Sequence, residues 1–101
     1  MTDVSDAIER LRARFCDRAA ADLDNLQLWS SDPAAHGAQL HALVHRLAGA
    51  AGTFGFQRLS ALAAKAEDAL LTASPDRTRA LAEVMGELAR IGAPGPAPDA
   101  P

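Results

Sequence analysis

The placement of proline is the feature that most constrains how this chain folds. Four of the six prolines fall in the last eight residues, within a segment that begins at Gly92. The other two, Pro33 and Pro75, each follow a residue that caps helices well, Asp32 and Ser74. Proline is disfavoured inside a helix but favoured at its first position, so these two pairs mark predicted helix starts.

Apolar residues recur every three or four positions between these marks, which predicts helices over residues 5–30, 33–54, 56–72 and 75–91. The 24 alanines and 13 leucines are strong helix formers, and with only four aromatic residues the core must be aliphatic. The sequence therefore predicts an all-α protein, most simply an antiparallel up-down four-helix bundle over residues 1–91 with a disordered tail at 92–101. The apolar stripe expected for the first helix is Ile8, Leu11, Phe15, Ala19, Leu23, Leu26 and Trp29.

Composition excludes several functional classes. A net charge of −3 and a pI near 5.5 argue against nucleic-acid binding, which usually requires a basic stripe. No apolar run is long enough to span a membrane, and the acidic N-terminus lacks the apolar core of a secretory signal. The single cysteine, Cys16, excludes an internal disulfide, so we expect a cytoplasmic protein. Neither GxxxxGK[ST] nor GxGxxG is present, so we expect no ATP site in this chain.

One segment conflicts with its own predicted helix. Gly49 and Gly52 lie inside the helix expected over 33–54, and each costs about 1 kcal/mol relative to alanine. Helical spacing places these glycines on one face with His41, His45 and Ala48, opposite the core-facing residues. An outward imidazole beside a strip of small residues is a place where another protein's backbone can approach closely.

Residues 45–55, HRLAGAAGTFG, resemble the signature of histidine-containing phosphotransfer domains. In that family the histidine accepts a phosphoryl group from the aspartate of one receiver domain and passes it to another. The resemblance matches His45 to the phosphorylated histidine, residues 49–51 to the run of small residues, and Gly55 to the glycine that ends the helix. It implies a four-helix bundle with the histidine exposed in mid-helix, and with the predicted helices it spans most of the chain.

The chemistry of the residues fits this resemblance. Neutral imidazole is nucleophilic near pH 7, and in-line phosphoryl transfer requires positioning and neutralisation of the phosphoryl charge. The resemblance implies that the partner receiver domain supplies Mg²⁺, an acidic pocket and a lysine, so this chain needs no metal or cofactor. It further implies a phosphocarrier, not an enzyme, acting between a hybrid histidine kinase and a response regulator in a multistep phosphorelay.

The chain departs from the family pattern at Ala48, where the family usually has a lysine three residues after the histidine. Either that charge is dispensable, or a nearby base, Arg46, Arg58 or Lys65, supplies it. The surface expected to dock the receiver around His45 comprises His41, Arg46, Ala48, Gly49, Gly52, Arg58 and Lys65.

Three other interpretations compete with a phosphocarrier. A bundle that docks on a receiver or kinase without carrying phosphate would explain the missing lysine. A kinase-like dimerisation bundle is a second possibility, although two helices would suffice there. His41 and His45 have metal-site spacing, and His36 or Cys16 could add a ligand, but no third ligand is assured.

The glycines also have a structural interpretation. Gly55 is better explained as a helix C-cap, because glycine accepts a left-handed backbone. For Gly52, close packing within the bundle and access for a partner both remain open.

Overall fold

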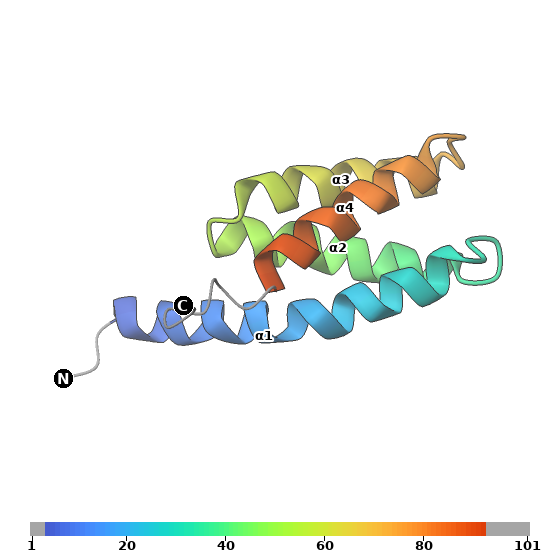
Figure 1. The fold of residues 1–101 in the computed structure, drawn as a ribbon. Helices are drawn as coiled ribbons and strands as arrows, with labels where there is room; N and C mark the ends of the chain where they lie inside the picture. Colours follow the sequence, from blue (N-terminus) through green and yellow to red (C-terminus); the bar gives the residue numbers. More distant parts are fainter. Residues whose placement is uncertain (1–3, 93–101) are drawn as a thin grey trace.

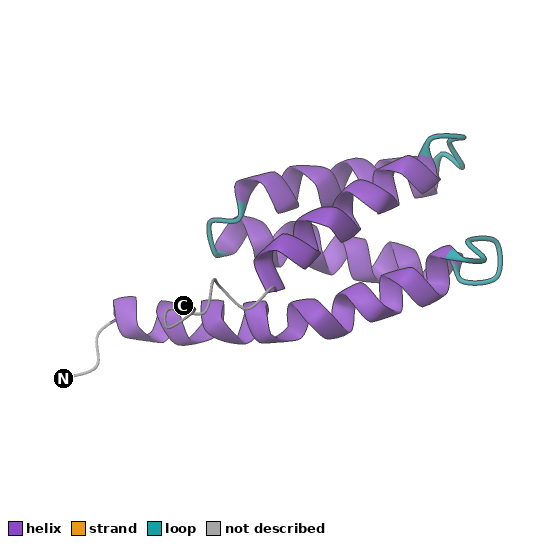
Figure 2. Ribbon diagram, in the orientation of Figure 1, coloured by secondary structure: helices purple, strands orange, loops and turns teal. Residues whose placement is uncertain are grey.

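The computed structural model describes residues 4–92, and these residues form four helices (Figure 1). They are α1 (Val4–Ser30), α2 (Gly37–Thr53), α3 (Gln57–Leu71) and α4 (Arg77–Gly92). No strand occurs in this part of the chain, so the prediction of an all-α fold is confirmed (Figure 2). The predicted tail lies outside the described residues, except for Gly92, which is the last residue of α4.

The four helices pack in a closed ring. α2 lies between α1 and α3, and α4 lies between α3 and α1 (Figure 1). The interface between α1 and α2 is the smallest of the four. α1 is the longest helix, at 27 residues, and its first turns extend beyond the ends of its neighbours in Figure 1.

The core is built from aliphatic side chains, as predicted. Phe15 is the one aromatic residue among the buried apolar residues of the described chain, and its ring packs against Phe54 and Phe56 at centroid distances of 5.9 and 5.3 Å. Alanines at facing positions let the helices approach closely. The largest fully buried side chains are Leu26, Leu40, Leu47, Leu59, Leu81, Leu88, Val44 and Val84.

The start of α1 differs from the prediction. Phe15, Ala19 and Leu26 are buried as expected, but Ile8 and Leu11, predicted to face the core, are 45% and 46% exposed. The reason is the length of α1: no other described helix lies opposite its first two turns (Figure 1). Periodicity correctly identified the apolar face of this helix, but it carries no information about where the opposing helices end.

The predicted start of the second helix at Pro33 is wrong by four residues. Asp32 does cap a turn, because its Oδ1 atom accepts a hydrogen bond from the Ala35 backbone N–H at 3.3 Å. The turn does not continue, because His36 leaves the helical region at φ −118° and ψ 23°. α2 therefore begins at Gly37. The Ser74 hydroxyl likewise accepts from the Asp76 N–H, and α4 begins two residues after Pro75.

The connection between α2 and α3 is a glycine-capped turn. Gly55 has a φ of +86°, its N–H donates to the Gly52 carbonyl, and the N–H of Phe56 donates to the Ala51 carbonyl. This pair of bonds forms a Schellman motif, in which the residue after the helix adopts the left-handed conformation that glycine tolerates best. The interpretation of Gly55 as a helix cap is confirmed.

Candidate functional site

His45 lies in the middle of α2 with its side chain 71% exposed. Its position follows from the register of the helix. Val44 and Leu47 are fully buried on either side of it in the sequence, and burying them turns position 45 toward solvent.

A carboxylate from α3 holds the imidazole. The Nδ1 atom of His45 lies 2.7 Å from Oε2 of Glu67, and the Nε2 atom of His41 lies 3.2 Å from the same oxygen. The two imidazole rings are nearly parallel, with centroids 6.1 Å apart. Glu67 is 21% exposed and lies between the two histidines, so both rings share one acceptor oxygen.

This contact defines the tautomer of His45. An ionised carboxylate only accepts hydrogen bonds, so Nδ1 must carry the proton that it donates to Glu67. The lone pair of the neutral ring is then on Nε2, the atom farther from the carboxylate. The arrangement therefore presents one nucleophilic nitrogen, in a fixed orientation, to a partner that approaches from solvent.

Glu67 was not identified from the sequence, although it makes the shortest polar contact of His45. It lies 22 residues away and belongs to no motif. The signal that could have found it is geometric. A three-residue connection folds α3 back along α2. A polar residue therefore lies beside His45 if its distance from the turn in α3 is similar to the distance of His45 from the turn in α2.

The small residues after His45 divide into two groups. A Cβ atom built on Gly49 meets nothing within 4 Å, so this glycine faces open space. A Cβ atom on Gly52 would lie 3.2 Å from the Ser60 hydroxyl, which donates to the Ala48 carbonyl at 2.8 Å. Gly52 therefore serves the close packing of α2 against α3, which answers the question that the sequence left open. Ala48 is half-buried against the core.

The three bases considered as substitutes for the missing lysine are each engaged with another helix. Arg46 reaches α1, where its Nη2 atom lies 2.7 Å from Oδ1 of the buried Asp22. Arg58 and Lys65 lie on the side of α3 that faces α4, where they pair with Glu87 and Glu83 at 3.4 Å. The hypothesis that one of them supplies a charge at His45 is not supported, because their ion pairs direct them elsewhere.

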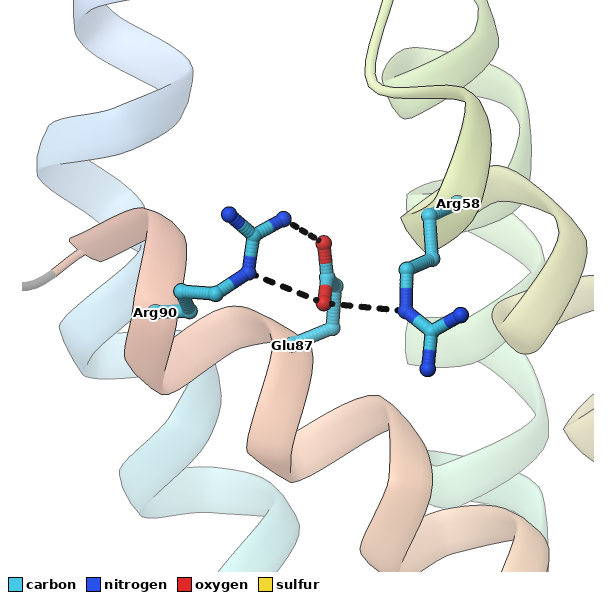
Figure 3. Close-up of polar contacts among 3 residues, drawn as sticks. All are labelled: Arg58, Glu87 and Arg90. Carbon is cyan, nitrogen blue, oxygen red and sulfur yellow. Dashed lines mark hydrogen bonds and ion pairs between the residues drawn. The ribbon is translucent and has the colours of Figure 1, made fainter.

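Glu87 forms the second polar cluster, and the sequence did not reveal it (Figure 3). Its side chain is only 7% exposed, yet Arg90 pairs with it through Nη2 and donates from Nε at 3.2 Å, while Arg58 pairs with it from α3. The hydrogen bonds from Arg90 hold the pKa of the Glu87 carboxyl below its usual value against the opposing effect of burial, and Arg58 adds to this. The cluster ties the start of α3 to the end of α4.

The lowered pKa of Glu87 predicts a loss of stability in acid. A depressed folded-state pKa contributes stability that is complete above the unfolded value of about 4.5 and is lost as the pH falls through the folded value. The urea midpoint of unfolding should decrease between pH 6 and pH 3.5, and this decrease should be smaller for Glu87→Gln than for the wild type. Glu83→Gln is the matched control, because Glu83 is 37% exposed. The urea midpoint of this variant should decrease by as much as that of the wild type. Equal losses in all three proteins would contradict a stabilising role of the Glu87 charge.

Two kinds of feature are absent from residues 4–92. No helix in that range is long and apolar enough to cross a membrane. The described histidine, cysteine, aspartate and glutamate side chains form no group of three suited to binding a metal ion, so His41, His45, His36 and Cys16 do not assemble the site considered above.

The fold and the histidine together define a class of protein: an α-helical bundle that exposes a carboxylate-oriented imidazole in mid-helix. Comparison with protein families gives a match to the Hpt domain over residues 10–93, which is most of the chain. No curated protein and no solved structure matches. The chain belongs to the Hpt domain family, the histidine-containing phosphotransfer domains. Members of this family are phosphocarrier modules, so the chain has a phosphotransfer role in two-component signalling, with partners such as receiver domains and kinases.

Proposed function

We propose that this chain is the histidine phosphotransfer protein of a multistep phosphorelay, with His45 as the phosphoacceptor. It takes the phosphoryl group from a receiver-domain aspartate and passes it to a response regulator. The observation that carries this proposal is the 2.7 Å contact between His45 Nδ1 and Glu67, which leaves Nε2 exposed and nucleophilic. His41 uses Nε2 for the same carboxylate and is half as exposed, which makes it the weaker candidate.

The transfer step follows from this geometry. The Nε2 lone pair of His45 attacks the phosphorus of an aspartyl phosphate, an N–P bond forms, and the P–O bond to the aspartate carboxylate breaks. The carboxylate leaves with the bonding electrons. The Nδ1 proton stays in its hydrogen bond, where the Glu67 charge stabilises the positive imidazole ring that forms. The reverse step returns the phosphoryl group to a second aspartate.

The chain supplies the nucleophile and the surface, and the partner supplies the remaining groups. The receiver domain brings Mg²⁺ and a lysine to the phosphoryl oxygens, so the proposal includes no cofactor or ATP site for this chain and places it in the cytoplasm with its partners. The docking surface comprises the exposed face around His45, with His41, Ala48 and Gly49. The return of the chain at each connection in Figure 1 supports an antiparallel up-down bundle over residues 1–91 as its scaffold.

Phosphoramidate tests this proposal without knowledge of the natural partner. The protein should gain the mass of one phosphoryl group, the gain should be lost in acid, and phosphorus–nitrogen coupling in the NMR spectrum should place it on His45 Nε2. Phosphorylation of His41 or His36 instead would contradict the proposal. A protein that binds a receiver domain but takes up no phosphoryl group from it would establish the docking-only function, which the alanine at position 48 favours.

Removing the carboxylate that orients His45 should slow phosphoryl uptake. In Glu67→Leu the ring loses the acceptor that fixes its tautomer, so we expect uptake from phosphoramidate to fall about 10–100-fold. Glu67→Gln should recover part of the rate, because its amide oxygen still accepts a hydrogen bond. Nitrogen chemical shifts of His45 report the tautomer directly and should show loss of the Nδ1–H form in Glu67→Leu. Glu83→Leu is the control, and an equal loss of rate there would refute a positioning role for Glu67.

A large side chain at Gly49 should block the partner without harming the fold. Gly49→Leu has open space for its Cβ and gains about 0.8 kcal/mol of helix propensity, so thermal unfolding should occur no lower than in the wild type. Transfer from a phosphorylated receiver domain should slow at least about 10-fold, since the bulk stands where the receiver docks. Gly86→Leu is the matched control, because Gly86 has equal space on α4. Identical transfer rates in the two variants would remove Gly49 from the docking surface.

A further inference from the structure

Glu67 differs from the other carboxylates that join two helices in the kind of partner it has. The others each contact an arginine or a lysine of another helix, in the pairs Asp22–Arg46, Glu83–Lys65 and Glu87–Arg58. Glu67 contacts His41 and His45, and among residues 4–92 no arginine or lysine pairs with it. The two histidines are therefore the groups that determine where this carboxylate lies.

His41 contacts Glu67 from one helical turn before His45. Its Nε2 atom lies 3.2 Å from the oxygen that accepts the hydrogen bond of His45 Nδ1 at 2.7 Å. The spacing of four residues places both rings on one face of α2, and the angle between the ring planes is 17°. A glutamate has three rotatable bonds, and fixing it costs conformational entropy. A second donor on α2 therefore restricts the positions that Oε2 of Glu67 can adopt.

The position of Glu67 affects whether His45 can react. A neutral imidazole carries its proton on either ring nitrogen, and a proton on Nε2 removes the lone pair that attacks phosphorus. The hydrogen bond to Glu67 keeps the proton on Nδ1. Because the side chain of His45 is 71% exposed, water would replace Glu67 as the partner of Nδ1 if the carboxylate moved away. A residue that keeps Oε2 in place can thus control the reactivity of His45 without contacting the phosphoryl group.

We propose that His41 is a positioning residue for phosphoryl transfer. It donates from Nε2 to Glu67 and holds that carboxylate against His45, and Glu67 in turn fixes the reactive tautomer of His45. The inference rests on the proposed function of His45 and extends it to a residue outside the HRLAGAAGTFG segment. It gives His41 a role within the protein in addition to its place on the expected docking surface.

Uptake from phosphoramidate tests this role without a partner protein, so a contribution of His41 to docking does not affect the result. His41→Leu removes the donor to Glu67, and uptake should slow about 3–10-fold, less than in Glu67→Leu. His41→Gln retains an N–H donor and should recover most of the rate. Gln39→Leu is the matched control, because Gln39 is an exposed residue of the same helix, and its uptake should equal that of the wild type.

Two further measurements distinguish positioning from a general structural effect. Nitrogen chemical shifts of His45 should show that the Nδ1–H tautomer is less populated in His41→Leu and is restored in His41→Gln. In a Glu67→Leu protein, the additional change His41→Leu should slow uptake no further, because His41 acts through Glu67.

Three results would overturn the proposal. They are uptake by His41→Leu at the wild-type rate or faster, an unchanged His45 tautomer in that variant, or an equal fold-loss from His41→Leu with and without Glu67. The proposed function fails on different evidence, namely a wild-type protein that takes up no phosphoryl group on His45. In that case the nitrogen spectra would still decide whether His41 holds Glu67 and the tautomer of His45.

Discussion

Replacing His45 by glutamine should leave a folded bundle that no longer takes up a phosphoryl group. The side chain of His45 is 71% exposed, and a glutamine amide can still donate to Glu67, so the free energy of unfolding should change by less than about 0.5 kcal/mol. Uptake from phosphoramidate or from a phosphorylated receiver domain should fall to background, because no other nitrogen of the site combines this exposure with a free lone pair. Intact mass measured before and after acid treatment gives the result directly.

Two other histidines provide matched controls for this substitution. His41→Gln removes a neighbour that shares Glu67 but leaves the Nε2 atom of His45 in place, so uptake should persist. His36→Gln changes a residue in the turn before α2 and should leave uptake unchanged. Receiver binding by His45→Gln should also persist, because the docking surface is intact. Undiminished phosphoryl uptake in His45→Gln would refute His45 as the acceptor.

The parts of the structure that follow from local patterns could be predicted from the sequence. The helices and the outward position of His45 depend on apolar spacing within single segments, and Gly55 caps α2 for a reason visible in its own residue type. Asp32 is an example of what local patterns do not predict. Its capping bond was predicted correctly, yet the helix began four residues later, because the conformation of His36 interrupts the helix.

Contacts between helices could not be predicted in this way. Nothing in the sequence distinguishes the three important carboxylates, Glu67, Asp22 and Glu87, from the other acidic residues among the 13. Only the packing of the helices brings them to their partners, which are His45, Arg46 and Arg90 respectively. The same limit explains why Arg46, Arg58 and Lys65 were considered as substitutes for the missing lysine. Distance along the chain suggested that they were near His45, whereas their side chains lie against other helices.

Arg46 therefore leads to the second large expected effect, a loss of stability in Arg46→Met. Asp22 is only 4% exposed, and its Oδ1 atom accepts a hydrogen bond from Arg46 at 2.7 Å. Methionine fills the space of the arginine stem but leaves the carboxylate buried without its cation. Breaking a buried ion pair costs about 3–5 kcal/mol, and the 38% exposure of the Arg46 side chain lets water reduce this to about 2–3 kcal/mol. The thermal midpoint should fall by roughly 10–20 °C.

A double variant separates the charge effect from packing, and the comparison decides what Arg46 does. Asp22→Leu/Arg46→Met removes both charges and should recover to within about 1 kcal/mol of the wild type, because an apolar pair needs no compensation. Lys65→Met, whose partner Glu83 is half-exposed, should cost no more than about 0.5 kcal/mol. If Arg46→Met instead keeps its thermal midpoint but slows transfer from a receiver domain, Arg46 acts in docking, as the sequence first indicated. If Arg46→Met loses stability while its phosphoramidate uptake is unchanged, the role of Arg46 is structural. Arg46 then joins α2 to α1 and so holds the helix that carries His45 in register.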